Sequence, residues 1–246
     1  MKNTVTLIAR ITFVASMLTL TDANGETEIE INDKPSEERD QAIEQVRGRG
    51  KAIFDSIITA NSERAPLGLG DVWPKAGKPG KRGTILDINK EVFESCSDFF
   101  TVFIDGENYG AAIWAPFGPR LGWALFAGGE IPPKEAAGHL TAANNIWAIA
   151  ANIEADMLDC IPILITRNVD PASLIPEEGD LSKQCLRPSS VFTTPFGDKG
   201  VVLVMKGGAI IYSADSLTEI NLEKLYKGQS LQGIRSALQK VKYLTP

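Results

Sequence analysis

An amphipathic helix in the first quarter of the chain constrains the fold more than any other feature of the sequence. Between residues 42 and 58, apolar side chains recur at the 3.6-residue period of an α-helix. Glu37 and Glu38, just after Ser36, suit the positive end of a helix dipole. A helix with one apolar stripe has to be covered by another element. We expect a helix–sheet core built from Ile43, Val46, Ile53, Phe54 and Ile57.

Two glycines, Gly48 and Gly50, fall inside this helix. Each costs about 1 kcal/mol relative to alanine in a helix interior. Close approach of another element would compensate for them, and a kink at the glycines is the alternative. The apolar pattern fades by residues 60–64, where we expect the helix to end.

The second half of the chain predicts antiparallel strands. The two strand pairs are residues 145–153 with 160–166, and residues 201–205 with 209–214. In the second pair Gly207 and Gly208 lie between β-branched runs, which is a strong hairpin signal, because type I′ turns need positive φ at both central positions.

Shorter helices complete the predicted architecture, at residues 90–104, 217–226 and 231–241. One long helix followed by antiparallel strands is typical of the α+β class. We therefore predict an α+β fold in which the long N-terminal helix packs on an antiparallel β-sheet, with additional short helices around it.

Residues 1–25 have the layout of a secretory signal. A basic start is followed by the mostly apolar segment Ile11–Leu20 and by small residues at Ala23 and Gly25. The apolar segment is shorter than the ~20 residues that a membrane-spanning helix needs. Cleavage after Ala23 and cleavage after Gly25 fit equally well, and a buried helix or an uncleaved anchor are the alternatives. We expect export to the periplasm or the exterior, with membrane anchoring if the leader is retained.

Three segments follow from these boundaries. Residues 1–25 are the leader, and residues 26–37 are acidic and predict a linker or a loose first strand. Residues 38–246 are long enough for one domain with its own core, and we expect a single α+β domain with C-terminal helices.

The charge balance argues against nucleic acid as a partner. The formal net charge is −6, and the one basic run, Lys75–Arg82, contains glycine and proline typical of a solvated loop. Neutralising phosphates dominates nucleic-acid affinity, so an acidic chain without a basic face is a poor candidate.

The cysteines and the single histidine limit metal and disulfide chemistry. Zinc sites need closely spaced Cys and His residues, and Cys96, Cys160, Cys185 and His139 show no such spacing. In an oxidising compartment Cys160 and Cys185 are the candidate disulfide, which leaves an odd thiol. Buried small hydrophobic side chains are the alternative role for all three cysteines.

No catalytic motif stands out in the sequence. A triad would have to use His139, and no Gly-x-Ser-x-Gly nucleophile setting accompanies it. Glu154, Asp156 and Asp159 resemble a sparse calcium loop but lack the alternating ligands and central glycine of such loops. We expect a solvated turn there, with no catalytic residues, no cofactor and no metal.

Tryptophans supply the one rival functional hypothesis. Trp114 and Trp123 lie in the Gly- and Pro-rich segment 106–133, and with Trp147 they could line a carbohydrate groove. A secreted enzyme or carbohydrate-binding module built on this segment is therefore the alternative to a non-enzymatic protein. Tryptophans that fill a core or cover a sheet are the simpler interpretation.

Several short segments resemble bacterial type II secretion pseudopilin-like proteins, which have prepilin-type N-termini. The segments are Thr6-Leu7-Ile8, Asn61-Ser62-Glu63-Arg64, Val72-Trp73-Pro74-Lys75, Asn144-Asn145-Ile146-Trp147, Ile165-Thr166-Arg167-Asn168 and Pro195-Phe196-Gly197-Asp198-Lys199-Gly200. The leader departs from the prepilin motif, since residues 1–10 contain no glycine and Ala9 stands where the family has glutamate.

The resemblance implies an N-terminal helix laid against an antiparallel sheet. It also implies a structural or interaction role among other secretion or envelope proteins, without enzymatic activity. The degenerate N-terminal motif implies a general secretory leader in place of prepilin processing. Membrane contact is then expected only if the N-terminal segment is uncleaved.

Overall fold

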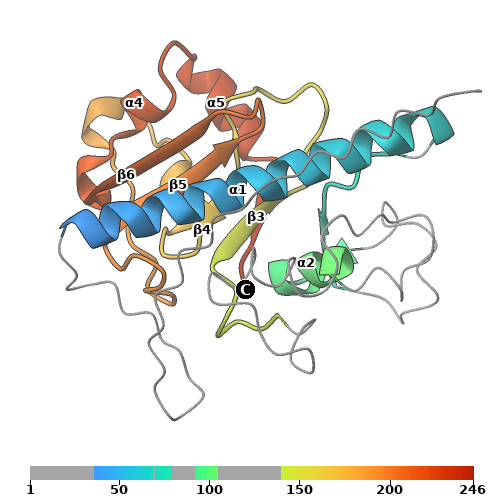
Figure 1. The fold of residues 1–246 in the computed structure, drawn as a ribbon. Coiled ribbons are helices and arrows are strands. Elements are labelled where there is room, and N and C mark those ends of the chain that lie inside the picture. The colour runs from blue at the N-terminus through green and yellow to red at the C-terminus, as the bar shows by residue number, and fades with distance from the viewer. Residues whose placement is uncertain (1–35, 69, 79–91, 105–139) are drawn as a thin grey trace, which may run out of the picture.

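One long helix lies across a five-stranded antiparallel sheet in the computed structural model, which describes residues 36–68, 70–78, 92–104 and 140–246 (Figure 1). The helix α1 (Ser36–Arg64) has 29 residues and runs without a break through Gly48 and Gly50. The helix ends at Arg64, which lies within residues 60–64, where the sequence pattern predicts its end. The fold is mixed helix and sheet, as the α+β prediction requires.

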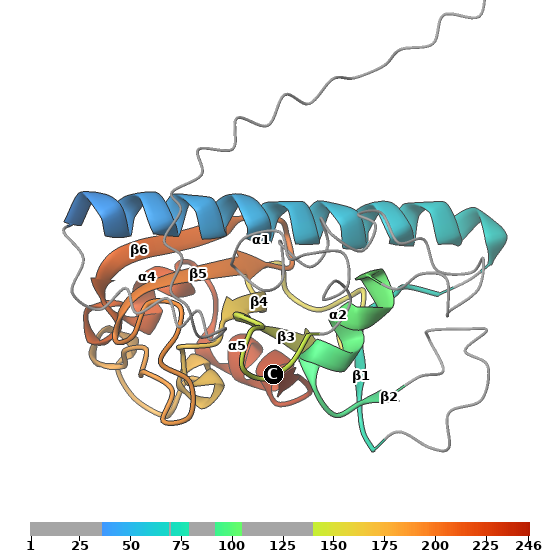
Figure 2. The same cartoon turned by 60° about the horizontal axis from the view of Figure 1, so that its bottom comes forward.

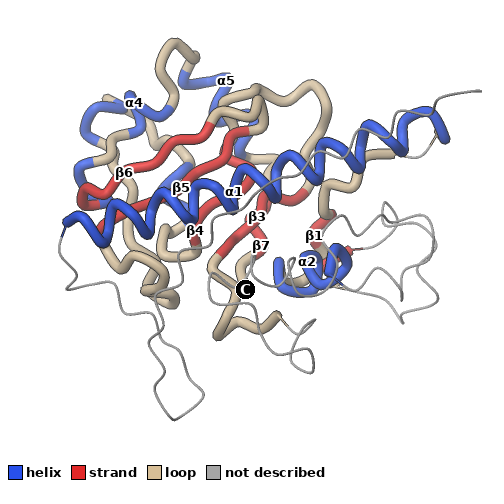
Figure 3. The backbone as a smooth tube through the Cα atoms, viewed as in Figure 1, coloured by secondary structure: helices blue, strands red, loops and turns tan. Residues whose placement is uncertain are grey.

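The sheet has the strand order β6-β5-β4-β3-β7 (Figure 3). Every neighbouring pair of strands is antiparallel. The strands are β3 (Trp147–Ala151), β4 (Pro162–Thr166), β5 (Lys199–Met205), β6 (Ile210–Ser216) and β7 (Lys242–Leu244). The first four fall within the predicted strand pairs or extend them by two residues. The short strand β7, which pairs with β3 at the C-terminal end of the chain, was not predicted.

Smaller elements surround the sheet. They are β1 (Lys75–Ala76) and β2 (Val92–Phe93), which pair in parallel, and the helices α2 (Cys96–Ile104), α4 (Leu222–Leu225) and α5 (Leu231–Leu238). Short 3-10 turns lie at Ala65–Leu67, Pro171–Leu174, Leu181–Lys183 and Leu217–Glu219.

All three predicted short helices are shorter than the sequence pattern suggested: α5 ends at Leu238, and the other two begin late because a side chain caps them. The Ser95 hydroxyl accepts a hydrogen bond from the Asp98 N–H, so α2 begins only after Ser95, and β2 occupies the preceding residues. Likewise, the Asn221 side chain accepts from the Lys224 N–H and starts α4.

The sheet separates two apolar cores. α1 lies along one face, over β5 and β6, whereas α4 and α5 lie on the other side of the sheet (Figure 2). Four of the five residues expected in the helix–sheet core are at most 5% exposed, and the fifth, Phe54, is half-buried against that core. The stripe ends at Ile58, which is 38% exposed.

Gly50 marks the closest approach of α1 to the sheet. A Cβ atom at this position would lie 3.0 Å from the Trp147 ring and 3.1 Å from a Val204 methyl group. At Gly48 a Cβ would meet nothing within 4 Å. Close approach therefore explains Gly50, whereas nothing in the packing explains Gly48.

Several sequence predictions lie outside the described residues. These are the leader 1–25, all but the last two residues of the acidic segment 26–37, and the tryptophan-rich segment 106–133. Within the ranges that are described, no helix combines the length and apolar character needed to cross a membrane.

Replacing Gly50 with valine should lower the free energy of unfolding by about 2 kcal/mol, because the new methyl groups would overpack the contact with Trp147 and Val204. The matched control is Gly48→Val, where there is open space and valine has a slightly better helix propensity than glycine. Chemical denaturation of both variants measures the difference. Equal effects at the two positions would contradict a close approach at Gly50.

Candidate functional site

Two of the pseudopilin-like segments meet at one end of the sheet. Asn145 precedes β3, whereas Arg167 and Asn168 follow β4, and antiparallel pairing places these positions at the same end. All three side chains are at most 7% exposed, which is unusual for such polar groups. We call Asn145, Arg167 and Asn168 the sheet-end cluster.

Arg167 joins two loops through its guanidinium group. Its Nε donates to the Thr194 hydroxyl at 2.9 Å and to the Thr194 carbonyl at 3.3 Å. Its terminal nitrogens donate to the carbonyls of Ala142 and Ala143, and the Phe192 ring lies 5.2 Å from the guanidinium carbon. Burial lowers the pKa of Arg167, and no carboxylate among the described residues forms an ion pair with it. Backbone carbonyls therefore take the place of a counter-ion.

Asn168 holds the chain segment that leads into β5. Its side-chain amide donates to the carbonyls of Gly197 and Gly200, at 3.0 and 2.9 Å. Gly200 has a φ of +102°, and a Cβ there would lie 3.2 Å from the end of the Ile43 side chain on α1. Within the described residues, the Asn168 Oδ1 has no hydrogen-bond partner. The amide thus fixes a turn that passes directly beneath the long helix.

Asn145 links α2 to β3. Its amide donates to Cys96 Sγ at 3.0 Å and to Ser97 Oγ at 3.1 Å, while its oxygen accepts from the Trp147 N–H. The Cys96 thiol in turn donates to the Trp147 carbonyl at 2.9 Å. Burial raises the pKa of Cys96, so the group stays a protonated thiol at neutral pH. A reactive cysteine needs an accessible, stabilised thiolate, and Cys96 has neither feature.

The chemistry of the sheet-end cluster is therefore structural. Nearly every polar group in it is used in hydrogen bonds to backbone or to buried side chains. Such bonds position loops, whereas a catalytic group has to face a space that a substrate can enter. The signal that could have identified these residues was the position of Asn, Arg and Asn immediately beside strongly apolar strands.

The segment after α1 is held in the same way. Asn61 Oδ1 accepts from the Val72 N–H at 2.8 Å, and Arg64 Nε donates to the Gly70 carbonyl at 2.9 Å. Further along, the Pro74 carbonyl accepts from the Asn152 N–H at the end of β3. The polar residues of these segments thus hold the connection between α1 and the sheet.

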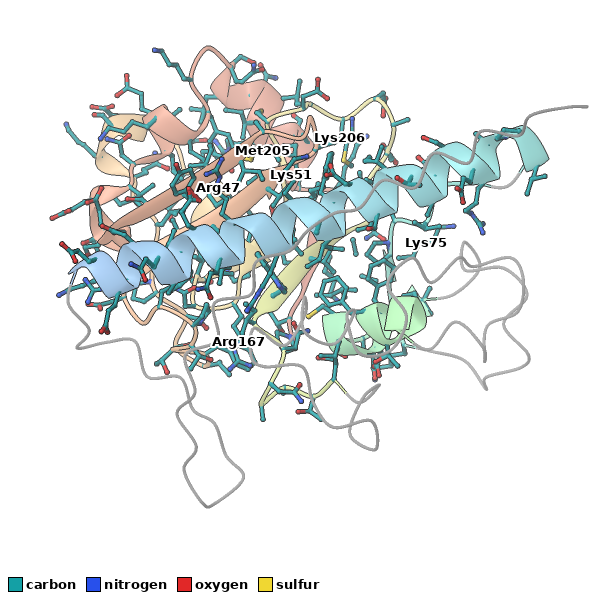
Figure 4. The ribbon with its side chains drawn as sticks, in the orientation of Figure 1. Arg47, Lys51, Lys75, Arg167, Met205 and Lys206 are labelled. Carbon is teal, nitrogen blue, oxygen red and sulfur yellow. The ribbon has the colours of Figure 1, made fainter. Side chains whose placement is uncertain are left out.

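Lys206 organises the acidic turn between β3 and β4. Its ammonium group donates to the carbonyls of Ala155 and Met157, at 3.0 and 2.9 Å, and lies 3.7 Å from Asp159 Oδ1. Its side chain is 14% exposed. At the same turn, Lys240 Nζ lies 3.1 Å from Glu154 Oε2. Two lysines thus supply the positive charge at this turn, which lies at the opposite end of the sheet from Arg167 (Figure 4).

The other sequence candidates do not converge on a site in the described part of the chain. Trp114, Trp123 and His139 lie outside the described residues. Trp147 is fully buried beneath α1, so it does not line an open groove. Among the residues that the structure describes, no group of three or more Cys, His, Asp or Glu side chains could hold a metal ion.

The three cysteines are free thiols in the structure. Cys96 is buried, and Cys160 and Cys185 are half-buried. The disulfide between Cys160 and Cys185 is not formed and stays a prediction for the exported protein.

Comparison with models of known protein families, with curated proteins and with solved structures finds no match for this chain.

Arg167→Met should lower the free energy of unfolding by about 3 kcal/mol, because it leaves buried carbonyls and the Thr194 hydroxyl without a charged donor. Arg187→Met is the matched control, since Arg187 is 56% exposed and pairs with Asp170 at the surface. Urea unfolding should show a small effect for the control. Comparable losses for both arginines would contradict a structural role specific to Arg167.

Lys206→Met should lower the free energy of unfolding by about 2 kcal/mol, because two carbonyls of the acidic turn lose their donor. Lys240→Met removes one charge from the same turn but breaks only an exposed pair, so thermal unfolding should change little. If Lys206→Met melts like the unsubstituted protein, the ammonium group does not hold the turn.

Proposed function

We propose that this chain is an exported, non-enzymatic, pseudopilin-like structural or interaction protein related to type II secretion components. The observation that carries the proposal is the lengthwise packing of α1, a 29-residue helix, on an antiparallel sheet (Figure 1). Among the described residues this helix comes first and the strands follow it, which is the order that the pseudopilin resemblance implies. A pilin-like architecture is the specific form of the observed helix-and-sheet fold that we favour.

The roles of the resembling segments also support a structural protein. Asn61, Arg64, Asn145, Arg167 and Asn168 direct their polar groups to backbone carbonyls, backbone N–H groups or buried side chains. Residues used in this way preserve the shape of loops. The described segments that carry the resemblance therefore help to hold the loops of the domain in place.

The exposed loops are the proposed contact points with partners. Leu67, just after α1, is 72% exposed, and Val191, in the loop before β5, is 74% exposed. Each of these side chains offers exposed apolar surface that a protein partner could cover. We propose other secretion or envelope proteins as partners, with no nucleic acid, and with the membrane only if the leader is retained.

The test is the N-terminal mass of the protein recovered from an extracytoplasmic fraction. Processing by a general secretory route predicts a mature start at Asn24 or Glu26, with no methylation. An intact or methylated N-terminus would instead place the chain in a membrane-rooted, pilus-like assembly. Recovery of the chain from the cytoplasm alone would contradict export altogether.

A further inference from the structure

The two edges of the five-stranded sheet are protected differently. β7 is three residues long, begins with Lys242 and contacts β1. β6 is seven residues long, and within the described chain it pairs only with β5. Residues 210–214 of β6 carry no charge. A long, uncharged edge of this kind is a template for another strand.

The backbone groups at the outer edge of β6 follow from the neighbouring strands. The Val202 N–H donates to Thr166 Oγ1 on β4, so the backbone groups of Val202 point away from β6. Tyr212 lies opposite Val202 in the register, which makes these two residues a non-hydrogen-bonded pair. The N–H and C=O of Tyr212 therefore point outward from the sheet. Those of Ile210, two residues back along the strand, point the same way.

The helix α1 runs antiparallel to β6 and flanks it. The Arg47 guanidinium lies 4.7 Å from the centre of the Tyr212 ring, which is 45% exposed. At the other end of the strand, a Cβ at Gly208 would lie 3.1 Å from the Phe54 ring. Rising residue numbers in α1 therefore correspond to falling numbers in β6, with Arg47 level with Tyr212.

The flank of α1 beside this edge is charged. It carries two ion pairs, Glu44 with Arg47 and Lys51 with Asp55, and all four side chains are at least 40% exposed. Arg47 and Lys51 lie one turn apart on the side of the helix toward β6 (Figure 4). Along the helix axis, Glu44 lies ~4.5 Å before Arg47 and Lys51 lies ~6 Å after it.

We propose that β6 pairs with β6 of a second copy of this chain, antiparallel and about a two-fold axis at Tyr212. Tyr212 of each copy then exchanges both backbone hydrogen bonds with Tyr212 of the other, and Ile210 lies opposite Ala214. The two exposed tyrosine rings lie side by side on one face and cover each other. The two five-stranded sheets become one continuous sheet. The proposal concerns the folded domain and does not depend on the secretion role.

The charges on α1 favour this partner and this register. α1 lies over β5 and β6, so the two copies of α1 run antiparallel, two to three strand spacings apart, or about 10–14 Å. An axis level with Arg47 brings Glu44 of one copy opposite Lys51 of the other, twice by symmetry. An axis at Ile211 would instead bring Arg47 opposite Lys51, and an axis at Ser213 would bring the two Glu44 side chains together. Only the Tyr212 register of these three matches opposite charges.

The test is sedimentation of the purified protein over a range of concentrations. The parent should be a dimer that dissociates on dilution. Glu44→Lys and Lys51→Glu each place like charges opposite one another, so each should raise the dissociation constant at least about tenfold. An equal mixture of these two variants should form a heterodimer, because every lysine then faces a glutamate. The matched control is Lys240→Glu, which reverses an exposed, paired lysine just before β7, at the other edge of the sheet, and should leave the dimer unchanged.

Tyr212→Pro tests the backbone pairing independently of the charges. The Tyr212 N–H points outward, so proline removes it without breaking a hydrogen bond to β5. The variant should keep the circular dichroism of the parent and sediment as a monomer at concentrations where the parent is a dimer.

Three outcomes would overturn the proposal. The first is a parent that is monomeric at every concentration. The second is a dimer that neither the charge reversals nor Tyr212→Pro weakens, because its interface would then lie elsewhere. The third is failure of the two charge variants to form a heterodimer on mixing, which would show that the reversals act within one chain.

Discussion

The contact between Gly50 and Trp147 is the interaction on which the rest of the fold depends. The missing side chain at Gly50 lets α1 approach to a distance at which a Cβ would lie 3.0 Å from the indole ring. The backbone of Trp147 in turn bonds to Asn145 of the sheet-end cluster through its N–H and to Cys96 of α2 through its carbonyl. A single residue of β3 therefore links the long helix, the central sheet and α2. A methyl group added at Gly50 would press on the Trp147 ring and so disturb the packing of α1, the sheet and α2 together.

Buried and partly buried polar side chains hold the loops around the apolar core. Arg167, Asn168 and Lys206 make their hydrogen bonds mainly to backbone carbonyls of loops, and a buried carbonyl left unpaired costs about 1–3 kcal/mol. These residues therefore fix loop positions at both ends of the sheet. A domain built in this way presents rigid loops on a rigid sheet, which suits the proposed role as a structural or interaction protein.

The sequence predicts the long helix and the strand pairs well, because each depends on a local signal. The apolar stripe of α1 recurs every 3.6 residues, and Gly207-Gly208 between two β-branched runs marks the hairpin of β5 and β6. The strand β7 carries no such signal, since its three residues become a strand only by pairing with β3. The hydrogen-bond partners of the sheet-end cluster were beyond sequence reasoning, because Asn145 and Asn168 meet them only after the strands have paired. Trp147 was one of the tryptophans considered for a groove, and its burial beneath α1 follows from a glycine distant in sequence.

The measurement that tests the central claim most directly is native-state amide exchange along α1 and β3 as denaturant is added. If α1 and the sheet are joined through Gly50 and Trp147, amides in the middle of α1 should open only with those of β3, in the same global unfolding step. Exchange of the α1 centre at a clearly lower free energy than β3 would show a helix that detaches by itself. That result would contradict the claim that this one contact joins the helix to the sheet.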